Sequence, residues 1–164
     1  MRFETTRFGA IDVDPASVIT FTQPIIGFPT CRRFVLMPGP PERDGRDSCV
    51  KWLQSVEAGE IAFLVMDPRL VYPNYEVDIR PDELAELAVS TVADLDVYTL
   101  VVVPADHTEV RTNLKAPILI NRTHRLAKQS VLDRKDYPIQ YFLVQAQRAA
   151  RRPEEVAPPE AARR

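Results

Sequence analysis

The sequence is poor in the residues on which most catalytic and cofactor sites depend. It contains only five glycines, two cysteines and two histidines in 164 residues. Neither a GxGxxG nor a GxxxxGK[ST] loop can be found in it, so the sequence predicts no nucleotide cofactor. The two histidines do not stand in HxxxH or HExxH spacing, so it predicts no metal site either.

Long apolar runs are also missing. No stretch reaches the roughly 18 consecutive apolar residues that a membrane span needs. The first ten residues lack the apolar centre of a signal peptide. A cytoplasmic protein without a membrane partner is therefore expected, in which Cys31 and Cys49 are reduced and structural.

An excess of positive charge is absent as well. The formal net charge is −2, which argues against direct binding of nucleic acid. Residues 145–164 are the exception, because they hold five arginines and three glutamates. RNA binding through this segment is a third and weaker hypothesis. Its Ala, Arg, Pro, Gln and Glu composition buries too little apolar area to offset the entropy of ordering. We therefore expect one domain at 1–143 and a flexible, disordered tail at 144–164.

Short apolar segments separated by glycine, proline and aspartate dominate the rest of the chain. This spacing predicts a mostly β protein, a small antiparallel barrel-like or sandwich domain. The expected strands are 2–8, 10–13, 17–21, 33–37, 50–56, 61–66, 75–79, 95–103, 114–120 and 124–132.

One short helix is expected at about 81–90. Pro81 suits the first helical position, and the carboxylates of Asp82 and Glu83 suit the positive end of the helix dipole. Leu84 and Leu87 then follow at the spacing that buries one face.

Two groups of residues leave an enzymatic alternative open. Cys49, His107 or His124 with a carboxylate would make a small cytosolic hydrolase or lyase, provided that the fold brings them together. No GxSxG motif supports this reading. Glu76 and Asp78 lie two apart on an expected strand and share a face, which suits either an acid/base pair or a solvated surface.

Negative charge is concentrated in residues 67–96. Eight acids face only two arginines there, which leaves a charge of −6 in thirty residues. Such a segment either attracts a basic protein partner or is a solvated helix with its flanking loops.

The stretch TNLKAPILIN, residues 112–121, shows the alternation of a half-buried strand. Leu114, Ala116, Ile118 and Ile120 share the expected core face. Pro117 cannot donate to a sheet ladder, so the strand is expected at an edge or a bulge. An edge would be either a protected edge or a place where a partner binds.

Several ordered blocks of the sequence resemble the flagellar assembly factor FliW family. The blocks are residues 3–37, residues 53–79 with MDPRLVYPNYE at their centre, NLKAPILIN at 113–121, and KQSVL with YPIQYFL towards the end. The resemblance extends from residue 1 to about residue 143. It implies a small antiparallel β-barrel-like domain without catalytic activity, cofactor or small-molecule substrate.

The resemblance also implies protein partners. Members of the family bind flagellin and the translational regulator CsrA. Sequestering CsrA relieves the repression of flagellin translation, and new flagellin removes the factor again. We expect segment 67–96 to meet the regulator, and residues 113–121 to meet flagellin or line the same surface. The candidate partner-binding residues are Asp67, Tyr75, Glu76, Asp78, Asp82, Glu86, Asn113, Lys115 and Asn121.

Overall fold

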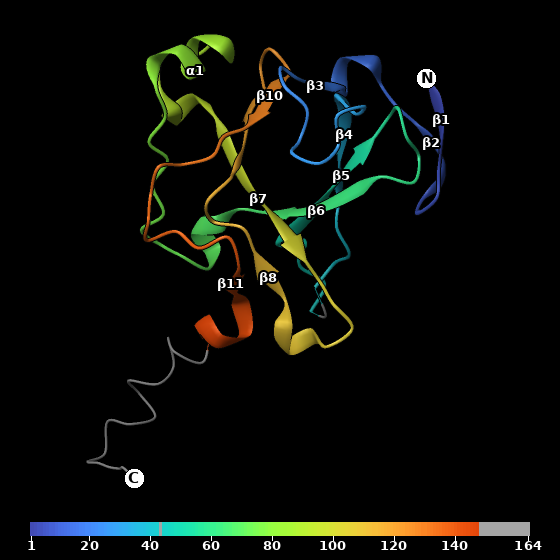
Figure 1. The fold of residues 1–164 in the computed structure, drawn as a ribbon. Coiled ribbons are helices and arrows are strands. Elements are labelled where there is room, and N and C mark those ends of the chain that lie inside the picture. The colour runs from blue at the N-terminus through green and yellow to red at the C-terminus, as the bar shows by residue number, and fades with distance from the viewer. Residues whose placement is uncertain (43, 148–164) are drawn as a thin grey trace, which may run out of the picture.

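Seven strands close into a barrel in the computed structural model, which describes residues 1–42 and 44–147 (Figure 1). These strands are β3 (Ile19–Phe21), β4 (Arg33–Pro38), β5 (Val50–Ser55), β6 (Ala62–Met66), β7 (Asp96–Val102), β9 (Ile118–Asn121) and β10 (Leu126–Gln129). Their order around the barrel is β7–β6–β5–β4–β3–β10–β9, and β9 pairs with β7 to close it. All neighbours are antiparallel except β3 and β10. The prediction of a mostly β, barrel-like domain is confirmed.

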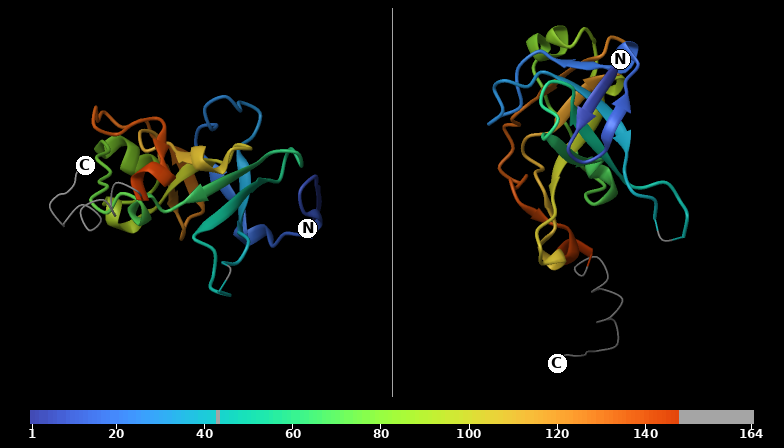
Figure 2. Two further views of the ribbon diagram at one scale, coloured as in Figure 1. Left: turned by 90° about the horizontal axis from the view of Figure 1, so that it is seen from below. Right: turned by 90° about the vertical axis from the view of Figure 1, so that its right-hand side faces the viewer.

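Shorter elements surround the barrel. They are the hairpin of β1 (Arg2–Thr5) and β2 (Gly9–Asp12), the strands β8 (Arg111–Thr112) and β11 (Tyr141–Phe142), the helix α1 (Pro81–Glu86), and the 3₁₀ turns Pro15–Ser17, Pro68–Leu70, Val92–Asp94 and His107–Glu109. The hairpin and α1 lie at opposite ends of the molecule in both Figure 1 and Figure 2. Within the described ranges, no helix is long and apolar enough to cross a membrane.

Most expected strands are present, but the one at 75–79 is wrong. Its alternation is real, since Tyr75 and Val77 are buried while Glu76 and Asp78 are exposed. No strand pairs with it, because its backbone is held by other contacts. The Tyr137 hydroxyl accepts the Glu76 N–H at 2.7 Å. The alternation of apolar and polar residues in 75–79 therefore predicted the buried side chains correctly, although the segment is not part of a sheet.

The stretch 112–121 also differs from its prediction. β9 is not an edge strand, because it lies between β10 and β7. Pro117 falls in an interruption between β8 and β9, where residues 113–117 face only Thr99 and Leu100 of β7. Of the two predicted alternatives, an edge strand or a bulge, the bulge corresponds to this interruption at 113–117. Both faces of the segment are buried, since Leu119 and Asn121 are as enclosed as Ile118 and Ile120.

The helix is shorter than expected. α1 ends at Glu86, because Leu87 is its C-cap and Ala88 takes a positive φ of 59°. Residues 143–147, where the end of the predicted domain meets the start of the predicted tail, are helical. The remainder of that predicted tail, 148–164, lies outside the described residues.

Three apolar clusters hold the domain together. The first fills the barrel and includes Phe21, Phe34 and Leu53. The second lies between the barrel wall and the segments around α1, and includes Tyr75 and Tyr137. The third packs the β1–β2 hairpin against the outside of β4 through residues Val13, Val35 and Val56, together with partly buried neighbours. Two parts of the barrel's outer wall are therefore covered by the chain itself.

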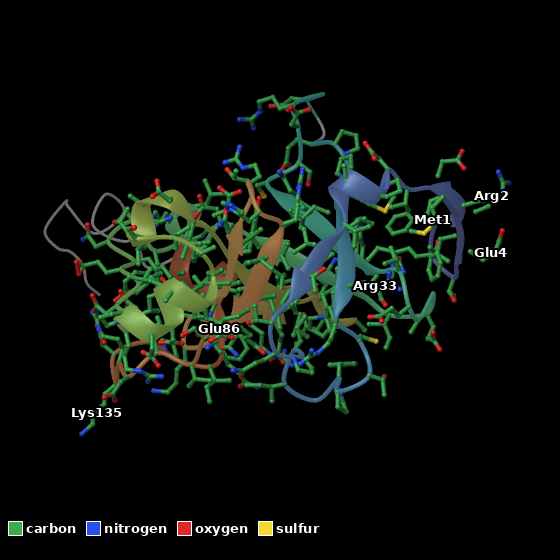
Figure 3. All side chains as sticks on the ribbon, turned by 90° about the horizontal axis from the view of Figure 1, so that it is seen from above. Met1, Arg2, Glu4, Arg33, Glu86 and Lys135 are labelled. Atoms are coloured by element: carbon green, nitrogen blue, oxygen red, sulfur yellow. The ribbon has the colours of Figure 1, made fainter. Side chains whose placement is uncertain are left out.

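A buried ammonium group joins α1 to the barrel. Lys128 Nζ of β10 lies 3.3 Å from Glu83 Oε1 and 3.0 Å from Glu86 Oε1. Ser130 also donates to Glu83 at 2.8 Å, and the Thr22 hydroxyl donates to Glu86. Glu86 lies where the helix meets the barrel (Figure 3). Both carboxylates, Glu83 and Glu86, thus form their ion pairs and hydrogen bonds within the protein.

The same contacts control the ionisation of the two carboxyl groups. Burial raises the pKa of Glu83, but hydrogen bonds from Ser130 and the Arg80 N–H, with the charge of Lys128, outweigh burial and lower it overall. The Thr22 hydroxyl is the main cause that lowers the pKa of Glu86. Both pKa values lie below the ordinary 4.5. The stability that they contribute is therefore present above that pH, and is lost as the pH falls through the lowered values.

Replacing Lys128 should destabilise the fold strongly. Lys128→Met leaves two carboxylates without their cation, and breaking a buried ion pair from one side costs about 3 kcal/mol or more. Urea unfolding at neutral pH measures the loss. The control is Lys135→Met, because Lys135 is exposed and its replacement should leave the free energy of unfolding nearly unchanged. Equal stability of the two variants would contradict the role given to Lys128.

Candidate functional site

The fold offsets about half of the formal charge of the acidic segment 67–96. Six of its eight acids form ion pairs. The pairs are Asp67–Arg69, Asp78–Arg134, Asp82–Arg80, Glu83–Lys128, Glu86–Lys128 and Asp96–Arg122. Arg122, Lys128 and Arg134 come from outside the segment, and counting them reduces its charge from −6 to −3. The sequence therefore overstated the field that this segment presents.

The exposed acids that remain are few. Glu76 and Asp94 are exposed, and neither forms an ion pair within the described residues. Asp78 and Asp82 are also exposed, each beside a single arginine. Exposed pairs of this kind are weak, so their carboxylates remain available to a partner.

Two of the candidate residues are structural. Tyr75 is 3% exposed, its ring stacks on Tyr137 at 4.7 Å, and its hydroxyl donates to the Leu114 carbonyl at 2.6 Å. Burial raises the pKa of this hydroxyl. Asn121 is also 3% exposed, and its amide donates to the Leu87 carbonyl at 2.8 Å. Neither side chain reaches a partner in this conformation.

Three other candidates hold local structure at the surface. Asp67 accepts the Arg69 N–H at 2.9 Å and starts a 3₁₀ turn. Asn113 accepts the N–H groups of Lys115 and Ala116. Lys115 Nζ donates to the Arg134 carbonyl at 3.0 Å, which places it beside the arginine that pairs with Asp78. Lys115 thus lies near Asp78, whereas Asn113 is connected to it only through the backbone of Lys115.

The residues of the enzymatic alternative are not brought together. Cys49 is exposed and its N–H donates to Glu42. The His124 ring lies 3.2 Å from the Asn121 amide, and His107 is in a 3₁₀ turn. No hydrogen bond joins any two of these three residues in the ranges that the structure covers. Nor do the described residues contain a group of three His, Cys, Asp or Glu side chains suited to a metal.

An apolar groove on the outside of the barrel was not predicted. Trp52 of β5, Leu64 of β6 and Val101 of β7 lie side by side across three strands. Their chain neighbours Leu53 and Val65 point into the barrel, so alternation places this row outside. Val102 and Val103 extend it, with exposures of 48% and 51%.

We name this feature the Trp52 groove and define it by Arg7, Trp52, Leu64, Val101, Val102 and Val103. It encloses about 780 Å³. The sequence signal was present in the strand alternation and in the single tryptophan, but a row across three strands requires their register.

Comparisons with known proteins agree on one family. The family model described as FliW protein matches residues 2–143. The flagellar assembly factor FliW of Ruminiclostridium cellulolyticum is 33% identical over 144 residues, which is 88% of this chain and 95% of that protein. That of Caldicellulosiruptor saccharolyticus is 37% identical over 137 residues, covering 83% and 86%. A crystal structure of the flagellar assembly factor FliW superposes with a TM-score of 0.76 at 28% identity, covering 87% of this chain and 96% of that one.

The Cys49 thiol should react slowly, as an ordinary thiol does and an activated nucleophile does not. Partial burial raises its pKa, and the Glu42 carboxylate beside it raises the pKa further. Less thiolate is therefore present at neutral pH than in a free cysteine. A coloured disulfide reagent measures the rate, and Glu42→Gln should increase it by lowering the pKa.

Cys49→Ser is the control for this measurement, because it leaves only the buried Cys31. A folded protein with this change should not react. A wild-type rate above that of a free cysteine peptide would support the enzymatic alternative instead.

Proposed function

Because the chain belongs to the FliW family of flagellar assembly factors, we propose that it acts in the cytoplasm, without catalysis, by binding flagellin and a CsrA-type translational regulator. Sequestering the regulator would relieve the repression of flagellin translation. Newly made flagellin would then take the protein away from the regulator. The observation that carries the proposal is the family match over residues 2–143.

The separation of the residues Cys49, His107 and His124 supports a binding function. A hydrolase or lyase needs a nucleophile and a base within hydrogen-bond reach. A partner-switching protein needs binding surfaces instead, and this domain offers exposed charges and an apolar groove.

We place the regulator on the exposed acids Glu76, Asp78, Asp82 and Asp94. An RNA-binding regulator is expected to carry a basic face, which exposed carboxylates complement. Lys115 lies near Asp78 through Arg134, and we assign it and its neighbour Asn113 to the same proposed surface. Tyr75, Asn121 and Glu86 are left out, because internal contacts use their side chains.

Co-elution from a sizing column tests the proposed partners. The purified protein should form a complex with flagellin, and a separate one with the CsrA-type regulator, at micromolar concentration and moderate salt. Adding flagellin to the complex with the regulator should release the regulator, because the two partners are exchanged. Failure to co-elute with either partner would refute the proposed function.

Reversing exposed acids should slow the encounter with the regulator. In Glu76→Lys/Asp82→Lys/Asp94→Lys, the association rate at low salt should fall about tenfold, and the difference should shrink as salt is added. The matched control is Glu4→Lys/Asp12→Lys/Asp47→Lys, which changes net charge equally at exposed positions elsewhere. If both variants slow association alike, only net charge matters and the surface is misplaced.

A further inference from the structure

Among the residues that the structure describes, the Trp52 groove is a part of the barrel wall reached mainly by the β1–β2 turn, through Arg7 and Phe8. The hairpin covers the outside of β4, and the segments around α1 cover the outside of β9 and the start of β7. Between them the row of Trp52, Leu64 and Val101 faces outward. The volume of the groove, about 780 Å³, lies in the range of protein clefts that bind ligands.

One charged side chain lines this groove. The Arg7 guanidinium lies 4.2 Å from the centre of the Trp52 ring, and Phe8 meets the same ring edge-on at 5.9 Å. The turn that carries Arg7 is anchored, because the Thr6 N–H donates to the Gly59 carbonyl at 3.0 Å and Phe8 N–H donates to Thr5. Arg7 is therefore held over the apolar floor.

Arg7 has its charge available. Within residues 1–42 and 44–147 it forms neither an ion pair nor a hydrogen bond to a carboxylate. Glu60 lines the adjoining hollow together with Arg7, but no ion pair joins them. A guanidinium stacked on an aromatic ring keeps its donors at the rim, where they can bind a carboxylate in bidentate fashion.

We propose that the Trp52 groove binds a segment of a protein partner that presents two or three aliphatic side chains and one carboxylate. The inference rests on the proposed function in that the occupant belongs to a protein. The aliphatic groups would cover Leu64, Val101 and the tryptophan ring, and the carboxylate would pair with Arg7. Tryptophan and arginine together are the residue types that contribute most to protein interfaces.

Charge complementarity selects this occupant over a second copy of the chain. A two-fold contact through the groove would bring two Arg7 guanidinium groups to the same apolar surface, where like charges repel. A purely apolar segment would leave Arg7 without a partner as water is excluded, which carries a cost. A segment with one carboxylate meets both requirements.

Fluorescence of Trp52 provides a direct test, because it is the only tryptophan in the chain. The probes are three helical peptides of equal length. The first has leucines at i, i+3 and i+4 and one glutamate beside them, the second has lysine in place of that glutamate, and the third has serines in place of the leucines. The first should shift the emission of Trp52. The other two should bind about tenfold more weakly or not at all.

Reversal of the charge completes the test. Arg7→Glu should invert the preference, so that the lysine peptide binds more tightly than the glutamate peptide. Arg2→Glu is the control, because Arg2 lies on the same hairpin with its side chain pointing away from the barrel (Figure 3). It should leave the preference for the glutamate peptide unchanged. Equal binding of the first two peptides, or no emission change up to about 1 mM, would overturn the proposal.

The same variants separate this inference from the proposed function. If flagellin or the regulator uses the groove, Arg7→Glu should weaken its complex about tenfold while Arg2→Glu does not. If the wild-type protein binds neither partner, the proposed function fails. The peptide experiment still shows whether the Trp52 groove binds a segment with aliphatic side chains and a carboxylate. If both partners bind and Arg7→Glu leaves both complexes unchanged, the groove is not their docking site and the inference fails.

Discussion

The pairing of β9 with β7 is the constraint on which the rest of the structure depends. It satisfies the backbone of β9 on both sides and leaves the barrel without an open seam at this point. The interruption at 113–117 makes it possible, because the chain first pairs as β8 and then shifts before it pairs as β9. Asn113 stabilises the shift through two N–H groups, so this asparagine serves the fold first.

Closure of the barrel also determines where charge is found. β10 lies beside β9, and it carries Lys128 into the contact between the barrel and α1. Glu83 and Glu86 of the helix are then turned inward, and Arg122 and Arg134 reach acids far from them in sequence. About half of the formal charge of the acidic segment is thus offset by cations from other parts of the chain. Steering by this surface must come from a few exposed carboxylates.

The open wall of the barrel contrasts with these covered regions. Apolar clusters on both sides of the wall are completed by elements that precede or follow the barrel strands. In residues 1–42 and 44–147 the Trp52 groove is reached mainly by the β1–β2 turn, through Arg7 and Phe8. An apolar floor beneath a guanidinium that forms no ion pair in these residues suits recognition of a protein segment.

Much of the architecture followed from the sequence, and the reason is local. Alternation marked the strands of the barrel and the buried side of 75–79, and Pro81 with its acids marked the start of α1, because these signals act over a few residues. Several ordered blocks of the sequence indicated the family. Tertiary structure alone decided which strands pair, that β9 is interior, which acids find a cation, and that Trp52, Leu64 and Val101 form one row. Each of these depends on contacts between residues distant in the chain, and a periodicity along one strand does not encode its neighbour or its register.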